Sequence, residues 1–295
     1  MKNGPVCIHE GKNICGEGPV WDGKEQALYW VDIPQGLILR RSEADGAVTQ
    51  WSVGTDIGAM ALRADGGIVA GLRSGFAFFD PGSATVKLIG DPEADRSDTR
   101  FNDGKCDPQG RFWCGTFHDL PDPKKRQPVA ALYRLDADLT WHKMLDGVRG
   151  SNGIGWSPDG RTMYYTDTPT YRIDAFDFDP ASGALGNRRV FAALPAGVGR
   201  PDGLTVDAEG FVWSAHFDGW RVTRYRPDGA IDRTIMLPVR HVTSCAFGGA
   251  DLRTLYITSA TEDLTDEELA DQPLAGGLFA YHPGVGGLPM ARFAG

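Results

Sequence analysis

The sequence lacks long apolar segments and clustered basic charge. No window approaches the ~20 apolar residues that a membrane-spanning helix requires, and residues 1–13 have neither the basic flank nor the apolar stretch of a signal peptide. The formal net charge is −9, and the one basic run is Lys124-Lys125-Arg126. Because phosphate binding needs a clustered basic face, we expect a cytoplasmic protein that binds neither nucleic acid nor a membrane.

Motifs for disulfides, zinc clusters and serine hydrolases are also missing. The five cysteines are an odd number without Cys-x-x-Cys spacing, so the sequence indicates neither a disulfide framework nor a zinc cluster. No serine stands in a Gly-x-Ser-x-Gly turn, although His118, His216 and His241 lie on or near predicted loops. A serine-hydrolase triad is therefore not expected.

What the sequence does contain is a repeat of roughly 40 to 50 residues, the length of one four-stranded blade. Each copy has a small polar opening, an apolar strand-like run, a turn rich in Gly, Asp and Pro, and a second aromatic-rich strand. The copies begin at Glu17, Gly58, Asn102, Asn152, Asp202 and about Thr243. Six such units predict an all-β fold, a six-bladed β-propeller that occupies residues 1–295 as a single domain.

Turn chemistry places the strands within each copy. Pro and Asp-Gly pairs pre-set tight reversals, so first strands are expected at 154–156 and 203–206 and third strands at 37–41, 76–80, 131–136, 173–177, 222–227 and 277–282. Recurrent tryptophans at positions 21, 30, 113, 156 and 213 are interpreted as packing between blades. Residues 265–272 predict a short capped helical turn at the rim.

Aligning the turns places Glu17, Gly58, Asn102, Asn152, Asp202 and approximately Thr243 in one equivalent position, which we call the mouth column. In a propeller this column lies at one mouth of the central channel. Four of its six positions carry Glu, Asn, Asn or Asp. Such residues also suit strand entrances for local reasons, but carboxylates packed together repel one another. A bound cation would remove that repulsion.

The oxygen atoms of the mouth-column side chains predict the kind of metal site. Two carboxylates and an amide, without histidine or thiolate, favour Ca²⁺, Mg²⁺ or Mn²⁺, with Zn²⁺ or Fe²⁺ also open. Few protein ligands leave coordination positions for water and substrate, which is typical of a catalytic site. The sequence predicts one divalent ion at the mouth but does not identify it.

Four strings carry a resemblance to a known family: Gly16-Glu17-Gly18-Pro19-Val20-Trp21, Arg100-Phe101-Asn102-Asp103-Gly104-Lys105, Ser151-Asn152-Gly153 and Pro201-Asp202-Gly203-Leu204. Over nearly its whole length the chain resembles the gluconolactonase family, also called the senescence marker protein or regucalcin family. Residues 115–119 and 274–279 are similar to the bacterial sugar-acid lactonases of that family.

The resemblance implies a metal held by Glu17, Asn152 and Asp202, with Arg100 and Asn102 contacting the substrate. It also implies hydrolysis of an aldonolactone, a small sugar lactone, to the aldonic acid. Asp202 is then the expected general base, because a carboxylate beside the attacking water can take its proton and return it to the leaving alkoxide.

Substrate choice is expected to depend on loops over the mouth, chiefly 117–129, 216–220 and Tyr171. His118 and Asp119 stand where mammalian members of the family carry a carboxylate, so both are candidate substrate contacts and the sugar preference does not follow from the motifs. Pentonolactones are the first expectation and hexonolactones the second. A monomer or weak homo-oligomer is expected.

Two other functions stay open at this point. One is a non-catalytic calcium-binding or regulatory propeller, and the other is an organophosphate or aryl-ester hydrolase. For Arg100, an ion pair with Asp98 or Asp103 is the alternative to substrate binding.

Overall fold

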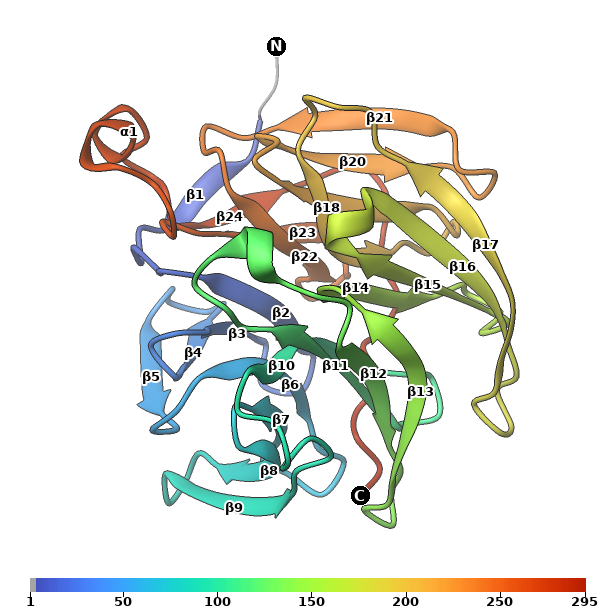
Figure 1. Cartoon of the computed structure of the whole chain (residues 1–295). Coiled ribbons are helices and arrows are strands. Elements are labelled where there is room, and N and C mark those ends of the chain that lie inside the picture. The colour runs from blue at the N-terminus through green and yellow to red at the C-terminus, as the bar shows by residue number, and fades with distance from the viewer. Residues whose placement is uncertain (1–3) are drawn as a thin grey trace.

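The structure is a computed structural model, and it describes residues 4–295. Its strands form six antiparallel sheets of four strands each, set as blades around a ring (Figure 1). The innermost strand of each blade contacts the innermost strands of both neighbouring blades, in the closed order β2-β6-β10-β14-β18-β22. The predicted all-β, six-bladed β-propeller is confirmed.

Five blades take their four strands in chain order from the channel outward. The first two blades consist of β2 (Gly16–Asp22), β3 (Ala27–Asp32), β4 (Leu37–Ser42), β5 (Val48–Ser52), and β6 (Ile57–Leu62), β7 (Ile68–Leu72), β8 (Gly75–Asp80), β9 (Thr85–Gly90). The next three consist of β10 (Thr99–Cys106), β11 (Phe112–His118), β12 (Ala130–Leu135), β13 (Trp141–Val148), then β14 (Ser151–Trp156), β15 (Thr162–Asp167), β16 (Arg172–Phe178), β17 (Leu185–Ala193), and β18 (Arg200–Val206), β19 (Val212–Phe217), β20 (Arg221–Tyr225), β21 (Ile231–Met236).

The sixth blade joins the two ends of the described chain. Its inner strands are β22 (Val242–Gly248), β23 (Thr254–Ser259) and β24 (Leu278–Tyr281), and its outermost strand is β1 (Val6–His9), which pairs antiparallel with β24. The ring is therefore closed by main-chain hydrogen bonds between segments far apart in sequence.

Three short helical segments lie between strands. They are η1 (Pro123–Lys125), η2 (Thr168–Thr170) and α1 (Asp266–Asp271). The α1 helix begins with the predicted capping box, in which Thr265 and Glu268 exchange side-chain to backbone hydrogen bonds. Within residues 4–295, no helix has the length and apolar character needed to cross a membrane.

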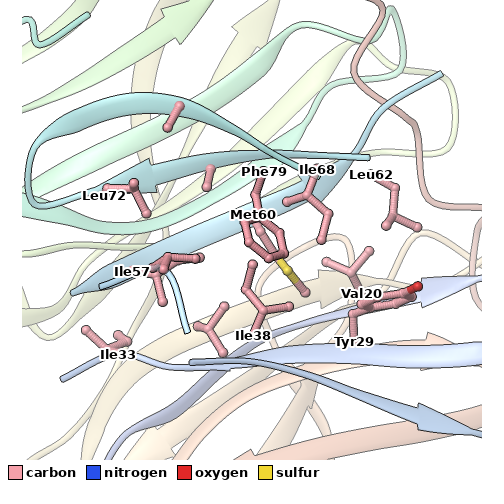
Figure 2. Packing of buried hydrophobic residues seen from close by; sticks show 14 of the residues in the cluster. Val20, Tyr29, Ile33, Ile38, Ile57, Met60, Leu62, Ile68, Leu72 and Phe79 are labelled. Carbon is pink, nitrogen blue, oxygen red and sulfur yellow. The ribbon is translucent and has the colours of Figure 1, made fainter. Parts of the chain in front are cut away.

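The hydrophobic core is divided among the interfaces between blades. Between the first two blades, Val20 and Tyr29 pack against Ile57, Met60 and Phe79 (Figure 2), and five similar clusters fill the other interfaces. The five predicted tryptophans are all buried in these clusters. They occupy two kinds of position, however, because two lie on first strands and three on second strands.

The second-strand tryptophans of two blades are fixed by the turn before them. Trp113 Nε1 donates to Asp107 Oδ2 and Trp213 Nε1 donates to Asp207 Oδ2, each at 2.9 Å. The other oxygen of each aspartate accepts backbone N–H groups of its own turn. One buried carboxylate thus shapes the turn and orients the tryptophan that packs between blades.

The C-terminal tail crosses the turn ends of the first three blades, at the end of the channel opposite the mouth column. Phe293 N donates to Leu62 O at 2.8 Å, Ala294 N donates to Gly110 O at 2.9 Å, and Arg292 Nη2 donates to Asp22 Oδ1 at 2.5 Å. The Phe293 side chain is fully buried in the cluster between the second and third blades. The tail therefore ties three blades together.

We predict that Phe293→Ala lowers the free energy of unfolding by about 3–5 kcal/mol, the usual loss for a buried phenylalanine. Leu88→Ala on β9 is the matched control, because Leu88 is 57% exposed whereas Phe293 is 0% exposed, and its effect should stay within ~0.5 kcal/mol. Denaturant unfolding followed by tryptophan fluorescence measures both. Equal stability of the two variants would contradict the assigned role of the tail.

Candidate functional site at the channel mouth

All six innermost strands lose register with their neighbour at the same step. The interrupted steps lie between Glu17 and Val20, Ile57 and Ala59, Phe101 and Asp103, Asn152 and Ile154, Pro201 and Leu204, and Val242 and Cys245. Every residue of the mouth column lies inside such an irregularity or at its edge. A β-bulge redirects a side chain away from the regular alternation of a strand, so the repeat places its polar side chains at positions built for that purpose.

Two positions of the mouth column offer no free polar group. At Gly58 a Cβ atom would stand 2.2 Å from Phe101 O and 2.6 Å from Asn102 N, so only glycine fits beside the third blade. Thr243 Oγ1 donates to Gly16 O at 2.6 Å. The available side chains of the column are therefore Glu17, Asn102, Asn152 and Asp202.

Hydrogen bonds orient the two asparagines. Asn152 Nδ2 donates to Thr168 Oγ1 of η2 at 2.9 Å, which leaves Asn152 Oδ1 facing Asn102 Nδ2 at 3.4 Å. Asn102 Nδ2 also donates to Ser151 O at 2.9 Å, and Asn102 Oδ1 accepts from Arg100 Nη1 at 2.9 Å. Asn152 thus presents an oxygen to the site, as a hard cation requires, while both Nδ2 hydrogens of Asn102 are directed at Ser151 O and Asn152 Oδ1.

The two carboxylates of the column are buried without a counter-charge. Glu17 is 4% exposed and Asp202 is 6% exposed, and within residues 4–295 neither forms an ion pair, since Arg200 is bound by Asp218 instead. Burial raises the pKa of Glu17 well above its usual value, and Asp202 and Asp103 add to that rise. Burial likewise raises the pKa of Asp202, with Asp103 the next cause. A divalent cation between them would supply the missing positive charge.

Arg100 lies beside Asn102 but does not form either predicted alternative ion pair. Its Nη1 donates to Phe101 O at 3.0 Å and to Asn102 Oδ1, and its Nε lies 3.7 Å from Asp119 Oδ1 and 3.9 Å from Asp56 Oδ2. In the part of the chain that the structure describes, no ion pair joins Arg100 to Asp98 or Asp103. That alternative is wrong because those carboxylates are directed elsewhere.

His118 is the last residue of β11, and Asp119 begins the loop that follows it. His118 Nδ1 accepts from Gln127 N at 2.8 Å and His118 Nε2 lies 3.1 Å from Asp98 Oδ2, so both ring nitrogens have partners that hold this loop. Asp119 is bound by Arg73, which also binds Asp56. A direct contact of His118 or Asp119 with substrate stays a prediction.

The sequence analysis missed the layer of residues directly below the mouth column. Asp103 is buried, its Oδ1 accepts from Gly104 N at 2.7 Å, and burial raises its pKa to about 6 although Lys105 opposes the rise. Lys105 Nζ donates to Leu204 O across the channel at 2.8 Å. Ser244 lines the same layer, and its side chain opposes the rise in the pKa of Glu17. The one sequence signal for Asp103 and Lys105 was that both follow Asn102 directly in the string Asn102-Asp103-Gly104-Lys105.

These geometries define what the mouth could hold. No group of three or more His, Cys, Asp or Glu side chains forms a metal cluster among residues 4–295, so an ion here would take Glu17, Asp202 and the Asn152 amide oxygen, with water or substrate as further ligands. An all-oxygen donor set with two anionic members fits a hard divalent cation.

The chain is similar to known proteins over nearly its whole length. A family described as "SMP-30/Gluconolactonase/LRE-like region" matches residues 15–261. The chain is 41% identical over 290 residues to the 6-deoxy-6-sulfogluconolactonase of Pseudomonas putida and 40% identical over 294 residues to regucalcin of Gallus gallus, with 98% of each chain covered in both comparisons.

The fold agrees as closely. A solved structure of the calcium-binding protein regucalcin from Agrobacterium tumefaciens has a TM-score of 0.92 and 27% identity, covering 99% of this chain and 97% of that one. The motifs, the ring of six blades and these full-length matches show that the chain belongs to the SMP-30/gluconolactonase family.

Proposed function

We propose that the protein is a metal-dependent lactonase that hydrolyses a sugar aldonolactone to the aldonic acid. The observation that carries the proposal is the pair of buried carboxylates, Glu17 and Asp202, that share the mouth with Asn152 Oδ1 and form no ion pair within residues 4–295. Glu17, Asn152 and Asp202 would hold one divalent ion. Ca²⁺, Mg²⁺, Mn²⁺, Zn²⁺ and Fe²⁺ all remain candidates for this oxygen-rich donor set.

The bound ion would supply Lewis-acid polarisation of the lactone carbonyl. The chain's own residues do the rest. The Asp202 carboxylate takes a proton from the attacking water while the water oxygen bonds to the carbonyl carbon. It then returns that proton to the ring oxygen as the bond between the carbonyl carbon and the ring oxygen breaks. The Arg100 guanidinium donates hydrogen bonds to substrate oxygens and so fixes the orientation of the ring. Asn102 would join it by turning to the substrate the Nδ2 hydrogen that points at Asn152 Oδ1 over 3.4 Å.

The relatives support a sugar lactone as substrate. The Pseudomonas putida relative carries the name of a gluconolactone derivative, which points to a six-carbon substrate and leaves the expected pentonolactones as the other candidates. The cytoplasmic location, the single-domain organisation and the monomeric or weakly oligomeric state stay predictions.

A calcium-binding protein without catalysis is the second candidate, because a solved relative is described as calcium-binding. The two functions differ in one measurement, since only a lactonase releases acid from aldonolactones. Phosphotriesters and aryl esters in the same panel test the remaining hydrolase alternative.

We predict that Asn152→Ala weakens metal binding by at least ~10–100-fold, the loss seen even for groups that only support metal ligands. The ring should stay folded, because Asn152 contributes an amide to the mouth and no apolar contact to a core cluster. Elemental analysis after gel filtration gives the occupancy, with Gln50→Ala on the exposed β5 as control. Full occupancy in Asn152→Ala would remove this residue from the site.

A second variant separates metal binding from proton transfer. Asp202→Asn should keep substantial metal, because an amide oxygen still ligates, but should lose ~10²–10⁴-fold in kcat, the usual contribution of a general base. Turnover is followed as acid release above the uncatalysed background, with the exposed Asp65→Asn as control. Near-normal turnover in Asp202→Asn would rule out the general-base role.

A further inference from the structure

Two arginine side chains pack on one aromatic ring at the channel mouth. The guanidinium carbon of Arg100 lies 5.2 Å from the centroid of the Phe117 ring, and that of Arg126 lies 4.5 Å from the same centroid. Each contact is a favourable cation–π interaction. Two like charges held on one ring repel each other. Asp119 lies near both guanidinium groups and offsets part of that repulsion, but it is itself bound by Arg73, so the pair of arginines can accept further negative charge.

Arg126 has unused hydrogen-bonding capacity, unlike its two arginine neighbours. Its Nε donates to Leu120 O at 3.1 Å, and within residues 4–295 its two terminal nitrogens make no hydrogen bond or ion pair. By contrast, Arg73 is bound by Asp56 and Asp119, and Arg100 is bound by Asn102. The pKa of Arg126 is lowered, chiefly by burial. A partly buried guanidinium with two free donors is able to bind an anion through a charge-assisted pair.

A chain of contacts connects Arg126 to the mouth column. Asn152 faces Asn102, Asn102 is bound by Arg100, and Arg100 and Arg126 share Phe117. Figure 1 shows the loop from β11 through η1 to β12 running over the centre of the ring in this view. Arg126, at the end of η1, also lies within electrostatic reach of Glu262 and Asp263 of the sixth blade. It therefore borders the space above the column rather than the outer surface.

We propose that Arg126, held on Phe117 beside Arg100, binds an anionic group at the end of the substrate far from the lactone carbonyl, so that the preferred substrate is a negatively charged aldonolactone. This inference rests on the proposed lactonase function. A planar guanidinium fork matches two oxygens of a sulfonate, phosphate or carboxylate. Arg126 would then determine specificity, while Glu17, Asn152 and Asp202 act at the other end of the molecule.

The test compares matched lactones in the metal-loaded enzyme. Gluconolactone is the neutral substrate, and its counterparts carry a terminal sulfonate, phosphate or carboxylate. For the wild type we expect higher kcat/KM on at least one charged lactone than on gluconolactone. Arg126→Gln should lower kcat/KM for that lactone by roughly 10- to 100-fold, mainly through KM, as loss of a charge-assisted pair predicts, and should change gluconolactone less than about threefold.

Three further variants test the interpretation. Lys125→Gln removes a neighbouring exposed charge and should leave the ranking of lactones unchanged, whereas Arg126→Lys should restore part of the preference. Glu262→Gln tests whether Arg126 instead serves as a latch to the sixth blade. If Glu262→Gln reproduced the effect of Arg126→Gln, or if Arg126→Gln weakened neutral and charged lactones equally, the anion site would be contradicted.

Failure of the anion site can be distinguished from failure of the lactonase function. Turnover of neutral lactones without any preference for charged ones would overturn the anion site alone. If no lactone were hydrolysed, the proposed function would fall, and calorimetry would still decide the anion site with open-chain aldonates carrying the same terminal anions. Binding that depends on both the terminal anion and Arg126 would support it, and binding independent of either would overturn it.

Discussion

The proposed site depends on the repulsion between two buried carboxylates at the channel mouth. Glu17 and Asp202 belong to the first and fifth blades, and the ring holds both at the mouth with almost no access to water. Removing an unpaired charge from water costs several kcal/mol per ion, and within residues 4–295 no ion pair offsets that cost, although Arg200 and Lys105 lie within electrostatic reach. The six apolar interfaces between blades, the shared sixth blade and the C-terminal tail make the ring rigid enough to sustain that cost.

The recurring bulge connects the repeat to the chemistry. Each blade repeats the same strand, turn and packing pattern, so each brings a side chain to an equivalent place at the mouth. The blades then differ in what stands there: a glycine where the neighbouring backbone approaches, a threonine that binds backbone, and acids or amides elsewhere. A hydrogen bond from Asn152 to Thr168 and one from Arg100 to Asn102 orient the amides. A regular scaffold thereby produces an asymmetric site.

The fold could be predicted largely because its turns are rich in Gly, Pro and Asp, which mark where each strand ends. The expected first and third strands all overlap observed strands, although 131–136, 222–227 and 277–282 run one or two residues past the observed ends. Outermost strands such as β9 carry few buried residues, so they leave little apolar periodicity to detect. The closing strand β1 and the tail depend on main-chain hydrogen bonds between distant segments, and a sequence of ordinary composition does not reveal such pairings.

The site was predictable to a smaller extent. Spacing alone brought together Glu17, Asn102, Asn152 and Asp202, since equivalent positions in a closed ring must converge. It could not show that Asp103 and Lys105 lie below them, because the bulge breaks the alternation from which side-chain direction is deduced. It also could not foresee that both nitrogens of His118 have partners in the chain, since those partners come from loop geometry.

One measurement tests the central claim most directly. The protein is stripped of metal with a chelator, single divalent metals are added back, and acid release from a panel of aldonolactones is followed. The account predicts no turnover above background in the stripped protein and recovery with at least one metal at a stoichiometry of about one per chain. Equal turnover in the stripped and reconstituted protein would contradict it.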